Sequence, residues 1–326
     1  CALPIYWSVV NLSLRYNACS LFNETTIVAL LIITTILWAF SFSLIGEYLA
    51  GSVDSYFSVL MRVGLAALVF LPFLRTRGQS PRTIVLYMLV GAMQLGIMYL
   101  LAFRAYLYLT VSEFLLFTVF TPLYITLIYD LISGRKLRWG YLLSAALAVL
   151  GAAIIRYDKV SDHFWTGLLL VQLSNICFAI GMVGYKRLME VRPMPQHNAF
   201  AWFYAGAFIV AVAAWFMLGN PQRLPSTGLQ WGVLVWLGVV ASGLGYFMWN
   251  YGATQVDAGT LGIMNNVHVP AGLLVNLAIW QEQPHWPSFI IGALVILASL
   301  WVHRRWVAPH SVQTADDRKR DSALSE

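Results

Sequence analysis

The sequence predicts an all-α membrane protein with ten transmembrane helices arranged as two inverted five-helix repeats. The 326 residues are 60% hydrophobic and only 10% charged, whereas soluble domains carry about 25% charged residues. The apolar residues form continuous runs of the length that crosses the hydrocarbon as a helix, rather than the short alternating segments of a barrel. Finally, the two halves of the chain share a pattern of prolines and tryptophans.

Apolar runs separated by polar breaks define the ten predicted spans. The first five are 28–46, 55–73, 83–103, 109–131 and 138–156. The second five are 164–186, 197–218, 229–250, 257–280 and 286–303. Each run is expected to be helical, because backbone groups in lipid must be paired within their own helix.

The basic residues predict how the chain is oriented. Fourteen of the 20 Lys and Arg residues lie in segments that are cytoplasmic if the first span starts inside, and four lie in the opposite loops. Positive charge concentrates on the cytoplasmic side of a membrane protein. We therefore expect a multi-pass membrane protein with both termini in the cytoplasm. The net charge of +6 is then a topology signal, so the lipid bilayer is the expected partner and nucleic acid is not. The oligomeric state is left open.

The two halves resemble each other around a proline and a tryptophan. The fourth span contains Pro122 in FTVFTPLYITLIYD, and the ninth contains Pro270 in NNVHVPAGLLVNLAIW. The next span opens with Trp139 in the first half and with Trp286 in the second. Five helices per repeat is an odd number, so the repeats are inverted, an arrangement typical of transporters that bind substrate near the midplane. A helix break is expected at each proline, because proline removes a backbone donor.

These patterns divide the chain into four segments. Residues 28–156 form the first repeat, 157–304 the second repeat and 305–326 a cytoplasmic tail. Residues 1–27 lack a convincing secretory signal. We expect them to be a non-native or upstream-translated leader, with the natural start at Val28.

Arg62 is the most informative single residue for function. It lies within an apolar run, where an arginine costs about 2.5 to 3.5 kcal/mol to insert and therefore needs a partner. One interpretation is a clamp for an anionic substrate, because the guanidinium group binds a carboxylate through two parallel hydrogen bonds. The alternative is a structural tie to a helix carbonyl or to Glu47, Glu113 or Asp130.

A second group of polar residues lies near the two prolines. Asn265, Asn266 and His268 come just before the ninth-span proline, and Thr118 lies four residues before the fourth-span proline. Amides supply both donors and acceptors, which suits a ligand with N–H and carbonyl groups. The alternative is that these side chains join helices to one another. Weaker candidates of the same kind are Gln94, Gln172 and Asn175.

Three central aromatic residues are candidates for the apolar wall of a binding site. Trp38, Phe117 and Tyr246 lie near the middle of their spans, whereas aromatic residues near helix ends usually belong to the interfacial belts of a membrane protein. For proton coupling the candidates are His268, whose ordinary pKa is near neutrality, and Glu113. Glu113 is alternatively a helix-start residue.

Several chemistries are disfavoured by missing motifs. There is no GxxxxGK[ST] loop for nucleotide phosphates, and no HExxH or GxSG signature of a hydrolase. The rival enzyme class is an intramembrane hydrolase that uses Ser242 and His268. The three cysteines have no metal-ligand spacing. We expect no enzyme activity, no metal and no cofactor.

The chain from about residue 28 to 304 resembles the EamA family of the drug/metabolite transporter superfamily. The resemblance rests on Trp38 in LWAFSFS, Arg62 in MRVGLAALVFLP and the two span prolines. Longer stretches, RAYLYLTVSE, GMVGYKRLM and GYFMWNYGATQVDAGTLGIMNN, resemble biotin-importing members of that family. The resemblance implies a carrier of the bacterial inner membrane that imports biotin, a small-molecule substrate, by alternating access. Arg62 would then bind the carboxylate, and Asn265 and Asn266 the ureido ring. The alternative is a carrier or exporter of another metabolite, such as an amino acid, an amine or another carboxylate.

Overall fold

The computed structural model describes residues 29–132, 162–255, 258–281 and 286–306, together with scattered positions between 140 and 154. The predicted leader, most of the predicted fifth span and the predicted tail beyond residue 306 lie outside the described residues. Within these described ranges every regular element is a helix, and no strand is present. The prediction of an all-α protein is therefore confirmed.

The helices of the two halves include short π-helical segments and a 3-10 segment, η2 (Leu71–Phe73). In the first half they are Ala29–Leu49, which ends in η1 (Ile45–Leu49), α2 (Ser55–Phe70), η2 (Leu71–Phe73), α3 (Pro81–Gly91), η3 (Ala92–Ile97), α4 (Met98–Ala105), α5 (Val111–Thr118) and α6 (Thr121–Ile132). In the second half they are α8 (Asp162–Val191), α9 (Gln196–Leu218), α10 (Gly228–Val235), η4 (Trp236–Leu244), α11 (Gly245–Ala253), α12 (Ala258–Val275), η5 (Asn276–Trp280) and α13 (Trp286–Trp306).

Most of these helices are long and apolar enough to cross a membrane. Among the described residues, seven helices meet this condition: Ala29–Leu49, Ser55–Phe73, Pro81–Ala105, Val111–Ile132, His163–Val191, Gln196–Leu218 and Gly228–Ala253. Two shorter apolar helices, His268–Trp280 and Trp286–Ser299, lie in the last two predicted spans. Every predicted span other than the fifth coincides with helix. The multi-pass architecture is confirmed, and the full count of ten remains a prediction because the fifth span is largely undescribed.

Local sequence signals explain where the early helices begin and end. Gly51 has a φ of 74°, which glycine adopts without steric cost, and it turns the chain after the first helix. Asp54 then caps α2, because its side chain accepts a hydrogen bond from the backbone N–H of Phe57 at 2.9 Å. Ser80 caps α3 in the same way, and Pro81 occupies the first turn.

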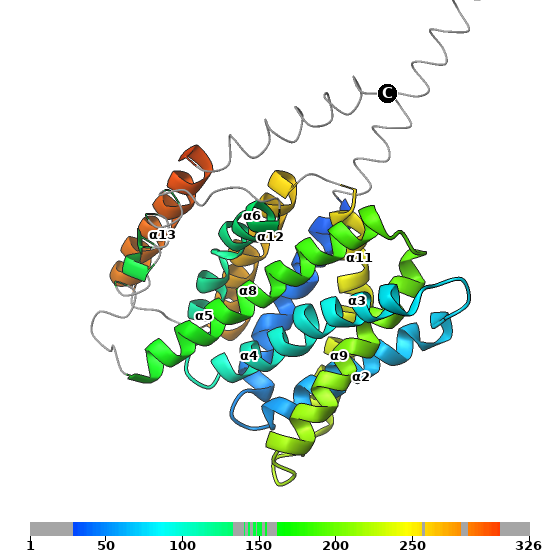
Figure 1. Cartoon of the computed structure of the whole chain (residues 1–326). Helices are drawn as coiled ribbons and strands as arrows, with labels where there is room; N and C mark the ends of the chain where they lie inside the picture. Colours follow the sequence, from blue (N-terminus) through cyan, green and yellow to red (C-terminus); the bar gives the residue numbers. More distant parts are fainter. Residues whose placement is uncertain are drawn as a thin grey trace, which may run out of the picture.

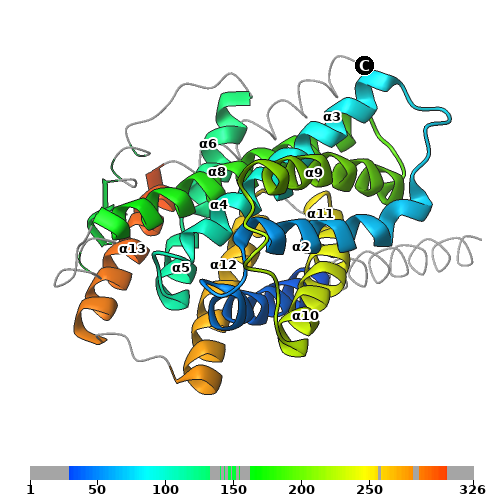
Figure 2. The same cartoon turned by 90° about the horizontal axis from the view of Figure 1, so that it is seen from below.

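The two halves of the chain pack directly against each other. α2 and α3 contact α9, α4 contacts α8, and α6 contacts both α8 and α12 (Figures 1 and 2). At the crossing of α3 and α9 the backbones touch. A Cβ atom on Gly91 would lie 1.9 Å from the carbonyl oxygen of Phe203, and one on Gly206 would lie 1.9 Å from that of Met88. Small residues permit such close approach between membrane helices. α13 lies at one edge of the bundle in both views.

The two span prolines have different effects on their helices. α5 ends at Thr118, a turn follows, and α6 starts at Thr121, so the fourth span is interrupted beside Pro122. In contrast, α12 continues through Pro270, and the helix changes to π-helical form only at η5. The expected break at Pro270 is therefore corrected to a continuous helix. Membrane helices tolerate proline where neighbouring groups and local adjustment of the helix satisfy the freed carbonyl.

Candidate functional site

A cavity of about 60 Å³ lies between the two halves of the chain. Its walls come from the first helix, α2, α4, α5 and the start of α6 on one side and from α8, α11 and α12 on the other. The lining is mostly apolar, and its polar or charged residues are Ser41, Arg62, Tyr99, Tyr106, Thr118, Thr121, Ser174, Asn175, Tyr246, Asn265 and His268.

Arg62 lines this cavity and is almost completely buried, with 3% of its surface exposed. Its Nε–H donates to the hydroxyl oxygen of Ser242 at 2.6 Å, and its Cζ lies 4.1 Å from the centre of the Tyr99 ring. Among the described residues no carboxylate forms an ion pair with it. A buried charge is costly unless it is compensated. The arrangement therefore leaves the positive charge available to an anionic ligand.

A polar cluster joins α5 to α12 across the cavity. Thr118 Oγ1 lies 2.9 Å from His268 Nε2, and His268 Nδ1 faces the backbone carbonyl of Asn265. Thr118 Oγ1 also donates to the carbonyl of Leu115 at 2.6 Å. Thr118 and His268, which the sequence placed at equivalent helices of the two halves, thus meet at one site.

Asn265 contributes an unsatisfied amide to the same site. Its side chain lines the cavity and is 2% exposed. Its Nδ2 is buried and has no hydrogen-bond partner within the part of the chain that the structure describes. Buried polar groups are normally paired, so this donor is suited to a ligand acceptor. The side chain of Asn266 lies outside the described residues.

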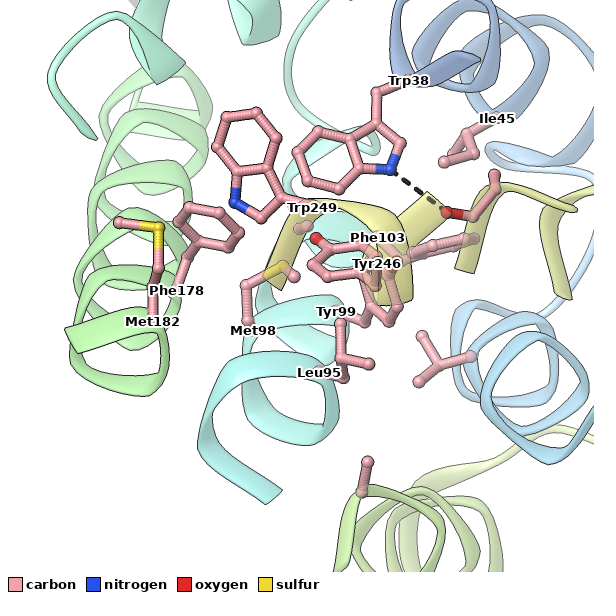
Figure 3. Close-up of a cluster of buried hydrophobic side chains, with 14 of the residues drawn as sticks. Trp38, Ile45, Leu95, Met98, Tyr99, Phe103, Phe178, Met182, Tyr246 and Trp249 are labelled. Carbon is pink, nitrogen blue, oxygen red and sulfur yellow. Dashed lines mark hydrogen bonds between the residues drawn. The ribbon is translucent and has the colours of Figure 1, made fainter. Parts of the chain in front are cut away.

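Aromatic side chains form one wall of the cavity. The Trp38 ring lies 4.5 Å from that of Tyr246 and 6.3 Å from that of Phe178, and all three residues line the site. Trp38 is held in place because its Nε1–H donates to the carbonyl of Ala241 at 3.1 Å, the dashed line in Figure 3. Behind this wall, the Trp249 ring packs 5.0 Å from that of Trp38 (Figure 3).

Two predicted site residues lie elsewhere. Phe117 is fully buried and packs edge-on against Phe164, with the ring centres 5.9 Å apart, so it does not line the cavity. Glu113 is part of a capping box at the start of α5. Its carboxylate accepts a hydrogen bond from the backbone N–H of Thr110 at 2.9 Å. Glu113 is therefore placed as the helix-start residue, which was the alternative to a cavity carboxylate.

Tyr106 is a lining residue that the sequence analysis did not single out. It follows α4, stacks on Phe114 with ring centres 4.3 Å apart, and lines the cavity. Its hydroxyl is buried without a hydrogen-bond partner among the described residues. No local motif marks it, because it lies in a connection beyond the apolar run of the third span.

The side chains required by the rival hydrolase do not come together. Ser242 Oγ contacts Arg62 and the Tyr99 hydroxyl, the latter at 2.9 Å, whereas His268 contacts Thr118 and the backbone of Asn265. A serine nucleophile needs a base within hydrogen-bond reach. Among the described residues, no group of three His, Cys, Asp or Glu side chains could hold a metal ion either.

Comparison with known proteins gives a consistent result over the whole membrane region. The model of the EamA-like transporter family matches residues 25–157 and 165–304. The chain is 83% identical over 298 residues to the "Biotin transporter" of Escherichia coli K12, a match that covers 91% of this chain and 100% of that protein. It is 82% identical over the same length to the "Biotin transporter" of Salmonella typhimurium. It is 56% identical over 276 residues to the "Probable biotin transporter" of Pseudomonas aeruginosa, covering 84% of this chain and 96% of that one.

A solved structure supports the fold independently. A chain described as "Crystal structure of protein" superposes with a TM-score of 0.59 at 17% identity, covering 89% of this chain and 98% of that one. At this identity the likeness concerns the fold alone. The family model, in contrast, matches the residues on both sides of the cavity, and the similar proteins are transporters rather than enzymes. The chain is a member of the EamA-like transporter family.

Proposed function

We propose that this transporter imports biotin across the bacterial inner membrane by alternating access. The observation that carries the proposal is the 83% identity to a relative named as a biotin transporter, over all of that relative's length. The chemistry of the cavity supports it, because the site has a cationic group, an aromatic wall, and hydrogen-bonding groups that have no partner among the described residues. Biotin has a carboxylate, a ureido ring and an apolar body that match these three features.

Arg62 would bind the carboxylate of biotin. Its Nε is already engaged by Ser242, which leaves the two terminal amino groups to face the ligand. A guanidinium group binds a carboxylate through two parallel charge-assisted hydrogen bonds. This interaction would compensate a buried charge for which no described carboxylate supplies an ion pair.

Asn265 and Tyr106 would bind the ureido ring. The Asn265 Nδ2–H group can donate to the ureido oxygen, and the Tyr106 hydroxyl can accept from a ureido N–H or donate to the oxygen. Both groups are unpaired within the described residues, so binding would remove two desolvation penalties. Asn266 stays in the proposal as a neighbouring amide of the same sequence motif.

The apolar part of biotin would lie against Trp38, Phe178 and Tyr246. These rings present a rigid wall, and Trp38 is fixed by its hydrogen bond to η4. Aromatic side chains bury a large apolar area at low cost in side-chain entropy.

His268 is our candidate for proton coupling. Nδ1 faces a carbonyl oxygen, which only accepts, and Nε2 faces the Thr118 hydroxyl, whose own proton can go to Leu115. Both nitrogens can therefore donate at once, which suits a protonated imidazole. Glu113 is the weaker candidate, because its carboxylate is used in a capping box.

The proposed topology places the two halves as inverted repeats, 28–156 and 157–304, with both termini in the cytoplasm. The two segments matched by the family model, 25–157 and 165–304, support this division. The distribution of Lys and Arg residues supports the orientation. In this topology the cavity lies between the repeats, where alternating-access transporters bind substrate.

The test is uptake of labelled biotin at nanomolar concentration by bacteria that neither make nor import it, with and without this protein. We expect uptake that unlabelled biotin abolishes by competition. Absence of uptake, with the protein present in the membrane, would contradict the proposal. The function would then be transport or export of another small metabolite by the same fold.

A further inference from the structure

We propose that Ser242 and Tyr99 position Arg62, and so determine that the site selects a carboxylate over a neutral ligand of the same shape. The inference rests on the proposed function, because it concerns how the Arg62 clamp is held. Ser242 and Tyr99 would act through Arg62 and would not touch the substrate carboxylate themselves. Neither residue stands out in the sequence as a partner of Arg62.

The first contact is a hydrogen bond from α2 to η4. Arg62 Nε–H donates to Ser242 Oγ at 2.6 Å, and both side chains are buried. A guanidinium group can bind both oxygens of a carboxylate either through Nε and one terminal amino group or through its two terminal amino groups. Because Ser242 already accepts from Nε–H, the edge with the two terminal amino groups is the one left for a carboxylate.

The second contact fixes the plane of the guanidinium group. The Cζ atom of Arg62 lies 4.1 Å from the centre of the Tyr99 ring, a cation–π contact that restricts tilting of the group. The Tyr99 hydroxyl lies 2.9 Å from Ser242 Oγ. Tyr99 thus contacts Arg62 through its ring and contacts the Ser242 hydroxyl through its oxygen, so the three side chains form a closed triangle.

The third element is the anchoring of Ser242 itself. Ser242 lies in η4, where the carbonyls of consecutive residues accept side-chain hydrogen bonds. Tyr204 donates its hydroxyl to the Ser242 carbonyl at 2.6 Å, and Trp38 donates to the Ala241 carbonyl at 3.1 Å. π-helical segments occur often at functional sites. Here the segment holds the Ser242 hydroxyl against α2, and the same segment holds the aromatic wall.

The geometry predicts that loss of the Ser242 hydroxyl changes the preference for the acid over the ester, and not only the affinity for ligands in general. A clamp that is free to rotate still attracts an anion, but it loses the second hydrogen bond to the carboxylate. Removing the Ser242 hydroxyl should therefore weaken binding of the acid more than binding of an uncharged ester, which accepts fewer bonds. A change that merely loosened the fold would weaken both ligands alike.

The experiment measures uptake of labelled biotin and its inhibition by unlabelled biotin and by biotin methyl ester. For Ser242→Ala we expect a KM for biotin about tenfold higher, the effect of one or two lost hydrogen bonds. We also expect the preference for acid over ester to fall by a similar factor. Ser242→Thr, which keeps the hydroxyl, should restore most of the preference. Tyr99→Phe keeps the ring and loses the hydroxyl contact, so it should lower the preference by a smaller factor.

Ser58→Ala is the matched control. Ser58 lies on α2 one turn before Arg62, is fully buried, does not line the cavity, and has a hydroxyl without a hydrogen-bond partner among the described residues. Uptake of biotin by the Ser58→Ala variant, and the acid-to-ester preference of that variant, should equal those of the wild-type protein. If Ser242→Ala does not reach the membrane, the acid-to-ester preference measured for Tyr99→Phe decides whether the positioning role holds.

The outcomes separate the two proposals. Suppose that cells containing the wild-type protein take up biotin while Ser242→Ala, or Tyr99→Phe where it decides, keeps the full acid-to-ester preference. That result would overturn the positioning role alone. Equal weakening of acid and ester would also overturn it, because that result indicates a structural role. No uptake of biotin by cells that contain the wild-type protein would overturn both proposals.

Discussion

Two groups of buried polar side chains lie between the halves of the molecule, and they differ in whether their hydrogen bonds are complete. Gln94 of η3 donates to Asn250 of α11 at 3.1 Å, and Asn250 donates back at 3.4 Å. Both side chains are 0% exposed, and neither lines the cavity. In the cavity, by contrast, the amide nitrogen of Asn265 and the hydroxyl of Tyr106 have no partner among the described residues.

The difference separates polar groups that hold the protein together from polar groups that await a ligand. A reciprocal amide pair satisfies itself and stabilises the contact between two helices. An unpaired buried group costs about 1 to 3 kcal/mol, which a ligand recovers on binding. Substitutions in the two groups should therefore act on different quantities, stability for the pair and affinity for the cavity.

The largest effect is expected for Arg62→Ala. Loss of a bidentate contact to a carboxylate should cost about 3 kcal/mol or more, so uptake of biotin should fall by about 100-fold. Thermal stability of the purified protein without ligand should be unchanged or higher, because the substitution removes a buried charge for which no described carboxylate forms an ion pair. Uptake assays, immunoblots of membranes and thermal unfolding in detergent, with and without biotin, measure these quantities.

Arg62→Lys is the control for charge without the planar fork. It should keep a fraction of the uptake, because an ammonium group supplies the charge but not two parallel hydrogen bonds. If Arg62→Ala instead lowered the stability of the ligand-free protein, or removed the protein from the membrane, the structural tie would be favoured over the clamp.

The next effect is expected for Asn265→Leu. It removes the proposed donor to the ureido oxygen, so KM for biotin should rise by about 20-fold while the ligand-free protein keeps its stability. Asn175→Leu is the matched comparison in the same cavity. The Asn175 amide already donates to the carbonyl of Phe117 at 3.0 Å, so its loss should lower thermal stability more than affinity. The reverse pattern in the two variants would contradict our division of the polar groups.

A smaller effect is expected for Tyr106→Phe. The ring remains stacked on Phe114, and only the unpaired hydroxyl is lost. KM for biotin should rise by about fivefold, the value of one neutral hydrogen bond, and ligand-free stability should not fall. Tyr87→Phe provides the contrast, because the Tyr87 hydroxyl donates to the backbone carbonyl of Arg192 at 3.0 Å outside the cavity. Its loss should lower stability and leave KM unchanged. A Tyr106→Phe protein with wild-type KM would remove Tyr106 from the site.

The helices were predictable from the sequence because the length of an apolar run and its polar ends determine a membrane span. The rotation of each helix was not predictable, since side chains facing lipid and side chains facing protein are both apolar. Phe114 and Phe117 illustrate this limit. They lie three residues apart on α5, yet only Phe114 lines the cavity. Hydropathy alone gives no signal that distinguishes them.

The candidate site was predictable where polarity contrasted with its surroundings. Arg62, Thr118, Asn265 and His268 stand out in apolar runs, and all four line the cavity. Gln94 stands out in the same way but pairs with Asn250, so contrast alone does not separate a ligand contact from a structural pair. The partner of Arg62 was not predictable, because Ser242 lies 180 residues away and has no local pattern.

The smallest effect on uptake is expected for the amide pair, and it tests the other side of the comparison. Gln94→Met leaves Asn250 buried without its partner and should lower stability by about 1 kcal/mol, with KM for biotin unchanged. The double variant Gln94→Met/Asn250→Leu replaces both amides with apolar groups of similar size, which is nearly neutral when both partners are removed. It should therefore recover most of the lost stability in thermal unfolding. If the single variant instead raised KM with unchanged stability, the pair would belong with the ligand-binding groups, because only a group that the ligand completes changes affinity in this way.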